Sequence, residues 1–160
     1  MSHEANDDTP GIRILPPFVY LGGLILGYAI WWFWPVPVVP GDWSFAIRVA
    51  GGVAVVLGVW LAIAAVLTFG RAGTSPDPHR PSTALALDGP YRFTRNPMYL
   101  GMALVQGGLA LAGNALWPLL ALVPVIWVIR TLVIAKEEQY LEALFGDEYR
   151  DFKARVRRWI

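Results

Sequence analysis

The stretch MYLGMALVQGGLALAGNALWPLLALVPVIWVI, residues 98–129, contains 32 residues without a charged side chain. One straight helix of that length would measure about 48 Å at 1.5 Å per residue, well beyond the roughly 30 Å of a hydrocarbon core. Turn and helix-breaking signals interrupt the stretch at Gly113-Asn114 and at Trp117-Pro118. The stretch therefore predicts a tight hairpin of two apolar helices, over residues 98–114 and 117–135.

Two earlier stretches have the length of a membrane span. Residues 14–34 and 49–69 are each 21 residues long without a charge, enough for a helix of roughly 30 Å. The chain of 160 residues is 56% hydrophobic and only 16% charged. We expect an all-α integral membrane protein with about four transmembrane helices. These lie at about 14–34, 46–69, 98–114 and 117–135.

The 160 residues are expected to form a single membrane domain. Residues 1–69 supply the two N-terminal spans, and residues 70–160 supply a binding loop, the helical hairpin and an amphipathic tail. Several classes of protein are excluded by composition. A net charge of +1 predicts no nucleic-acid partner. The absence of cysteine excludes disulfides and thiolate chemistry, and His3 and His79 are too far apart in sequence for a metal site.

Basic residues orient the spans. The 35–44 and 113–116 turns contain none, whereas the 70–97 loop and the tail contain many. By the positive-inside rule, both termini and the long loop are expected in the cytoplasm, with the protein in the cytoplasmic membrane. The basic residues counted are Arg71, Arg80, Arg92, Arg95, Lys136, Arg150, Lys153, Arg155, Arg157 and Arg158.

Two features leave alternatives open. Gly23 and Gly27 form a GxxxG pattern in the first span, which is typical of a dimer contact in a homo-oligomer or of close packing within the bundle. The tail after residue 136 has apolar residues at helical spacing, with a break at Gly146. It is expected either to lie on the membrane surface or to fold back over the cytoplasmic mouth.

The segment GPYRFTRNPMYLG, residues 89–101, places polar groups at the start of the third span. Asn96 and Pro97 suit the N-cap and first position of a helix. Capping alone would explain the pair, but a helix start facing the cytoplasm can also bind an anionic group. The belt of aromatic and basic residues typical of a membrane interface would explain Tyr91, Arg92, Arg95 and Tyr99.

Glu137 and Glu138 lie at the far end of the hairpin partner, so the hairpin places them beside the segment above. Arg130 precedes Glu137 by seven residues and is expected on the same helix face, either extending to the surface or facing a polar cavity. Cations, carboxylates and aromatic rings would then form a small pocket open to lipid. Such a pocket fits a zwitterionic cofactor that meets a lipidic substrate, and it also fits a channel vestibule.

An ordered set of motifs runs through the C-terminal half. They are Gly89-Pro90-Tyr91, the heptapeptide RNPMYLG at 95–101, Glu137-Glu138, and FGDEY at 145–149. In this order across a hairpin, the set resembles the isoprenylcysteine carboxyl methyltransferase family and the related membrane phospholipid methyltransferases. The resemblance covers about residues 70–158.

The resemblance implies methyl transfer from S-adenosylmethionine to a hydrophobic or lipid-like acceptor in the bilayer. The chain departs from the resemblance at Val133, where the prenyl-protein enzymes of the family have a substrate-side arginine. We expect Arg130, nearly one turn earlier, to substitute for it, and we expect Arg130 and Glu138 to be catalytic. Asn96 stands where the family has histidine, so an amide must take over any hydrogen bond made there. The cofactor-binding positions carried over are Thr83, Ala84, Leu85, Ala86, Tyr91, Asn96, Pro97, Met98, Tyr99 and Glu137.

Methyl transfer from a sulfonium needs alignment and exclusion of water more than a nucleophilic side chain. An amine acceptor must first lose a proton, and few bases lie near the site: Glu137, Glu138, Asp88 and His79. This favours an acceptor that is already anionic or neutral. The alternative function is a non-catalytic membrane scaffold or transport-associated protein. A nicotinamide-dependent membrane reductase is less favoured, because no feature would hold the ribose of its cofactor.

Overall fold

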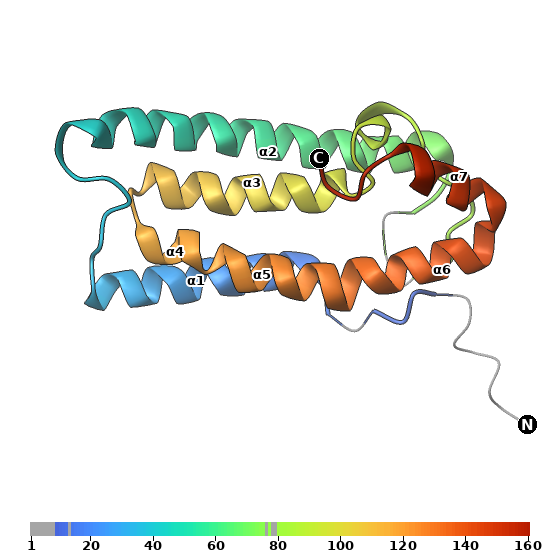
Figure 1. Ribbon diagram of the computed structural model, residues 1–160, viewed down its shortest axis with the longest axis horizontal. Coiled ribbons are helices and arrows are strands. Elements are labelled where there is room, and N and C mark those ends of the chain that lie inside the picture. Colours follow the sequence, from blue (N-terminus) through green and yellow to red (C-terminus); the bar gives the residue numbers. More distant parts are fainter. Residues whose placement is uncertain (1–8, 13, 76, 78–79) are drawn as a thin grey trace, which may run out of the picture.

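The computed structural model describes residues 9–12, 14–75, 77 and 80–160, and within these ranges it contains helices and no strand (Figure 1). The all-α fold class is therefore confirmed. The helices are α1 (Pro16–Phe33), α2 (Ser44–Ala72), α3 (Pro97–Ala112), α4 (Leu116–Leu120), α5 (Leu122–Val128), α6 (Ala135–Phe145) and α7 (Asp147–Arg155).

Three helices of the described chain are long and apolar enough to cross a membrane: α1, α2 and the continuous helix Leu116–Phe145. This last helix comprises α4, α5, the π-helical turn Ile129–Ile134 and α6. The expected count of four spans is not reached, because α3 has 16 residues and measures only about 24 Å. Large apolar side chains such as Phe18, Trp60 and Trp127 are exposed on the outer faces. Exposure on this scale is typical of a surface that faces lipid.

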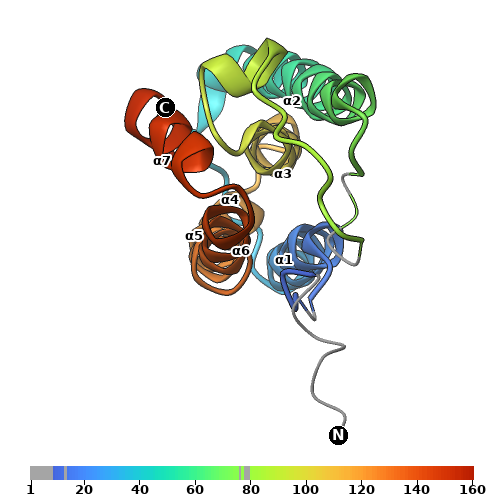
Figure 2. The same cartoon turned by 90° about the vertical axis from the view of Figure 1, so that its right-hand side faces the viewer.

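Helix α3 occupies the centre of the bundle, between α2, α1 and the Leu116–Phe145 helix (Figure 2). The hairpin expected between α3 and the next helix is present, and its turn contains Asn114 with a positive φ of 48°, which Asn tolerates better than most residues. The Asn114 side chain accepts hydrogen bonds from the backbone of Val38 and Val39 and donates one to the Val39 carbonyl. The turn therefore fastens the 34–43 connector to the hairpin.

Glycines bring the α2 and α3 backbones into direct contact. Gly51 faces Gly108, and Gly58 faces Gly101, in an antiparallel arrangement. A Cβ built on Gly58 would lie 2.6 Å from the Gly101 carbonyl oxygen. Small residues permit this approach and let dispersion forces act along both helices, which is how helices associate where lipid removes the hydrophobic driving force.

Helix α1 packs on the opposite side of α3. A Cβ on Gly27 would lie 2.3 Å from the Cα of Pro118, and one on Gly23 would lie 2.4 Å from a methyl of Val125. The Tyr20 hydroxyl donates to the Tyr99 carbonyl at 3.0 Å. The GxxxG pattern therefore serves packing within the bundle.

The Leu116–Phe145 helix contains a π-helical turn at Ile129–Ile134. It continues ten residues beyond Ala135, where the fourth span was expected to end, and so carries Glu137 and Glu138 out of the apolar bundle. The break expected at Gly146 is present, with φ 54°, and α7 turns back across the end of the bundle (Figures 1 and 2). Of the two expected positions for the tail, the structure has the folded-back one.

The contact between α2 and α3 predicts a matched pair of variants. Gly58→Ala should lower the free energy of unfolding by about 1–3 kcal/mol, the usual cost of overpacking, because its methyl group meets backbone. Gly52→Ala is the control on the same helix, since nothing lies within 4 Å of its Cβ. Thermal unfolding in detergent should show a lower midpoint for Gly58→Ala alone, and equal midpoints would contradict the close contact.

Candidate active site

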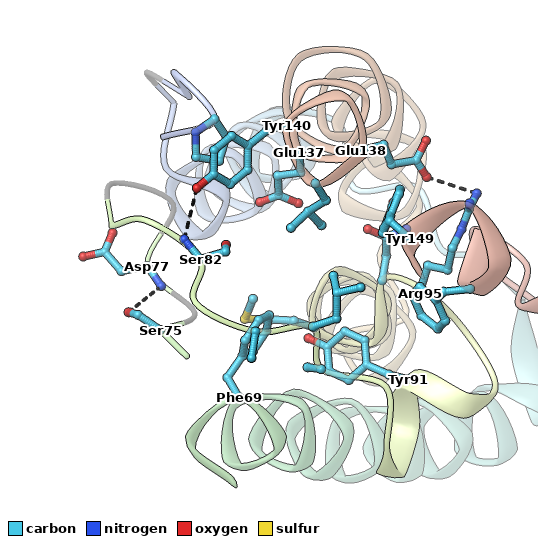
Figure 3. Close-up of a pocket in the computed structure, with 18 of the residues that line it drawn as sticks. Phe69, Ser75, Asp77, Ser82, Tyr91, Arg95, Glu137, Glu138, Tyr140 and Tyr149 are labelled. Atoms are coloured by element: carbon cyan, nitrogen blue, oxygen red, sulfur yellow. Dashed lines mark hydrogen bonds and ion pairs between the residues drawn. The ribbon is translucent and has the colours of Figure 1, made fainter. Parts of the chain in front are cut away.

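A pocket lies at the end of the bundle where the 73–96 loop and the folded-back tail meet α3 and α6 (Figure 3). Its enclosed volume is about 100 Å³, below the roughly 300–1,000 Å³ of most cofactor sites, so a ligand of that size would fill the open mouth as well. Its lining residues are Pro10, Phe69, Ser75, Asp77, Arg80, Ser82, Ala84, Leu85, Ala86, Tyr91, Arg95, Asn96, Met98, Tyr99, Glu137, Glu138, Tyr140, Leu141, Tyr149 and Phe152.

Glu137 points into the pocket from the first turn of α6 (Figure 3). The Tyr99 hydroxyl donates a hydrogen bond to its Oε1 at 2.5 Å, which joins α6 to the first turn of α3. The bond fixes the orientation of the carboxylate. Tyr99 occupies one oxygen, and the other is available to a cationic donor.

Aromatic side chains form much of the pocket wall. Tyr91 stands edge-on to Phe69, with ring centroids 5.4 Å apart. Burial, followed by the charge of Glu137, raises the pKa of the Tyr91 phenol above its ordinary value. The phenol is therefore protonated and can donate a hydrogen bond to a ligand. Aromatic faces beside a carboxylate suit an organic cation such as an ammonium or a sulfonium.

Glu138, the next residue, turns away from Glu137 toward Arg95 (Figure 3). Its Oε1 forms an ion pair with Arg95 Nη2 at 3.0 Å and accepts a hydrogen bond from Arg158 Nε at 3.0 Å, and its Oε2 pairs with Arg158 Nη2. Arg95 precedes α3, whereas Arg158 lies in the tail. We call this trio the Glu138 clamp, because it holds three separate segments around the pocket.

Arg95 is buried, with 9% of its side chain exposed. Its Nε and Nη1 have no hydrogen-bond partner among the described residues, although unsatisfied buried donors cost free energy. Glu138 occupies only Nη2. The two remaining donors of this pocket residue suit an anionic group such as a carboxylate.

Comparison with known proteins bears on what this pocket does. A family model described as phospholipid methyltransferase matches residues 46–148, more than half of the chain. The chain belongs to the phospholipid methyltransferase family. The resemblance expected from the motifs at 89–101 and 137–149 is thus confirmed, and the matched residues include most of the pocket of this family member.

One relative of this phospholipid methyltransferase family member is an uncharacterised protein of Haemophilus influenzae. It is 48% identical over 65 residues, which cover 39% of this chain and 100% of that protein. No solved structure matches the chain.

Most residues expected to form the site come together at this pocket. Nine of the twelve line it: Ala84, Leu85, Ala86, Tyr91, Asn96, Met98, Tyr99, Glu137 and Glu138. The other three do not. Pro97 is fully buried at the start of α3. Thr83 is exposed and fastens the loop to the end of α2, since its hydroxyl donates to the Gly73 carbonyl at 2.9 Å. Arg130 is exposed on the Leu116–Phe145 helix.

The π-helical turn explains why Arg130 does not share the face of Glu137. Its i→i+5 hydrogen bonds accommodate one residue more than an α-helical turn, so the seven-residue spacing no longer returns to one face. Ile129 is fully buried in place of Arg130. The expectation that Arg130 shares the face of Glu137 assumed an unbroken α-helix and is wrong for that reason. Of the two positions expected for its side chain, Arg130 does not face the pocket, and extension to the membrane surface stays a prediction.

Asn96 holds the expected N-cap position, and α3 begins at Pro97. Its side chain, however, makes no capping hydrogen bond. The amide donates instead to the Arg158 carbonyl at 2.9 Å. The expectation of a side-chain cap is therefore wrong, because the returning tail offers Asn96 a partner that the local sequence cannot reveal.

Several pocket residues were not expected from the sequence. Tyr140 accepts a hydrogen bond from the Ser82 backbone N–H at 3.1 Å, which places the 80–86 loop over α6. Tyr149 and Phe152 reach the pocket from the tail helix α7. Their helical spacing indicated an apolar face but not what that face covers. Of the two further candidate bases, Asp88 is exposed outside the lining, and His79 lies outside the described residues.

The Glu138 clamp yields a second prediction. Glu138→Gln should lower the free energy of unfolding by about 3 kcal/mol, since it leaves the buried Arg95 charge uncompensated. The tail should also become more sensitive to trypsin. Glu148→Gln removes an exposed carboxylate from the same part of the chain and should change stability by less than about 0.5 kcal/mol. Identical unfolding and proteolysis of the two variants would contradict the clamp.

Proposed function

We propose that the protein is an S-adenosylmethionine-dependent methyltransferase that acts at the membrane on a hydrophobic or lipid-like acceptor. The observation that carries the proposal is the pocket: Glu137 and Arg95 present opposite charges among aromatic rings. The pocket lies at the end of an apolar helical bundle, in a chain of a methyltransferase family.

The pocket residues fit the chemistry of this cofactor. Glu137, held by Tyr99, would accept the α-ammonium of the methionine part. The two unpartnered donors of Arg95 would bind its carboxylate. Tyr91, Tyr149 and Phe69 offer faces for the adenine ring and the sulfonium. When bound, S-adenosylmethionine supplies a methyl group already activated on sulfur.

The residues of the chain would therefore align the reactants and exclude water. The tail helix α7 would contribute to this by covering the pocket. They offer little capacity to deprotonate an acceptor. Glu138 is held by two arginines, and Glu137 is hydrogen-bonded to Tyr99. An acceptor such as a carboxylate or another group that needs no prior proton loss is favoured.

Cofactor binding to detergent-purified protein tests the proposal. Glu137→Gln removes the charge that faces the ammonium, so it should weaken S-adenosylmethionine binding by about 1.5–3 kcal/mol, the range of charge-assisted hydrogen bonds. Isothermal titration calorimetry measures the difference, with Glu148→Gln as the control of equal charge change outside the pocket. Wild-type protein that binds no cofactor would instead support the alternative function, a membrane scaffold or transport-associated protein.

The proposed cofactor is cytosolic, so the pocket must open to the cytoplasm. The 73–96 loop and the tail lie at one end of the bundle, and the 34–43 connector and the 113–115 turn lie at the other (Figure 1). By the positive-inside rule, the basic loop and tail support a cytoplasmic position for the pocket end.

Single cysteines test this topology in a chain that has none. Asp88→Cys, an exposed position in the pocket-end loop, should resist an impermeant thiol reagent added to intact cells and react after permeabilisation. Ser44→Cys at the start of α2 should react without permeabilisation. The opposite labelling pattern would show that the pocket end lies outside the cell, where a cytosolic cofactor does not reach it.

A further inference from the structure

A second hollow lies on the outside of the bundle, separate from the candidate active site. It runs along α2 and is closed on its other side by the 89–94 segment, Leu100 of α3 and the C-terminal Trp159 and Ile160. Its volume is about 1070 Å³. The 89–94 segment separates the two hollows, because Tyr91 lines the inner pocket whereas Arg92 and Phe93 line this outer groove.

The α2 wall of the groove changes character along its length. Trp60, Leu61, Ala64, Leu67, Thr68 and Arg71 line it, and this spacing of three and four residues places them on one face of the helix. From Trp60 to Arg71 the wall covers about 16 Å, close to half of the roughly 30 Å hydrocarbon core. The groove therefore matches the depth of one leaflet, apolar inside and cationic at the pocket end.

Two arginines mark the cationic end. Arg71 belongs to the last turn of α2 and Arg92 to the 3₁₀ turn that packs on it. Both are exposed, and neither forms an ion pair or a side-chain hydrogen bond within the part of the chain that the structure describes. Among the described residues, no aspartate or glutamate side chain lines the groove. The groove therefore has two guanidinium groups without an acidic side chain beside a long apolar wall.

We propose that this groove binds an anionic glycerophospholipid of the surrounding leaflet, with its phosphate at Arg71 and Arg92 and an acyl chain along α2 between Trp60 and Leu67. Guanidinium groups bind phosphate oxygens in a bidentate manner. Phe93 and Trp159 suit the flanks of such a lipid, since aromatic rings favour the membrane interface. The site is independent of the proposed methyl transfer.

Native mass spectrometry of the detergent-purified full chain tests this site. Phosphatidylglycerol and phosphatidylcholine with identical acyl chains are titrated separately. Wild-type protein should bind phosphatidylglycerol more tightly. The double variant Arg71→Gln/Arg92→Gln should lose roughly ten- to thirtyfold in phosphatidylglycerol affinity, as expected from about 1 kcal/mol per arginine, and should treat the two lipids alike.

Two further variants distinguish lipid binding in the groove from general electrostatic attraction between the protein and an anionic lipid. Arg155→Gln/Arg157→Gln removes the same charge from exposed tail positions outside the groove and should keep wild-type affinity. Ala64→Phe places a ring in the space beside the apolar wall and should weaken the binding of both lipids. Added inorganic phosphate should not displace phosphatidylglycerol. Equal loss in both double variants, unchanged affinity in Arg71→Gln/Arg92→Gln with its thermal unfolding intact, or displacement by phosphate would overturn the proposal.

Discussion

The backbone contact between α2 and α3 is the constraint on which the rest of the structure depends. Helix α3 is too short to span a hydrocarbon core and is surrounded by longer helices, so its position rests on side-by-side packing. The glycine pairs at 51/108 and 58/101 let the two backbones touch, and the approach fixes the depth at which α3 begins. Because Tyr99 lies in the first turn of α3 and holds Glu137, the height of the pocket floor follows from that contact.

The opposite wall of the pocket depends on electrostatics. Arg95 and Arg158 come from segments far apart in sequence, and the buried Glu138 forms an ion pair with each of them. Buried ion pairs add little net stability but are costly to break. The tail is therefore held in one place, and Asn96 adds a hydrogen bond to its backbone. Within the described ranges, two donors of Arg95 have no partner, and these are the donors to which the proposed function assigns a carboxylate.

The sequence was sufficient for the helical class, the hairpin and most of the pocket, because these follow from local patterns. Charge-free stretches predict apolar helices, Gly113-Asn114 predicts the turn, and adjacent motifs bring Tyr91, Tyr99 and Glu137 to one end. The features that the sequence did not predict depend on contacts between segments that are distant in the chain. Nothing local distinguishes Glu137, which faces the pocket, from Glu138, which binds two arginines. The tail that folds back also accepts the hydrogen bond of the Asn96 amide, so this side chain does not cap α3 as expected.

The π-helical turn at Ile129–Ile134 has a consequence for how the length of this chain can vary. Such a turn contains one residue more than the α-helix around it requires. A one-residue deletion inside it would let the helix close as regular α-helix and leave both flanking segments in their present rotation. The same deletion between Ala135 and Glu137 would turn the later residues by about 100° and move Glu138 into the position that Glu137 now occupies. Homologous chains that differ in length here can therefore keep the same pocket.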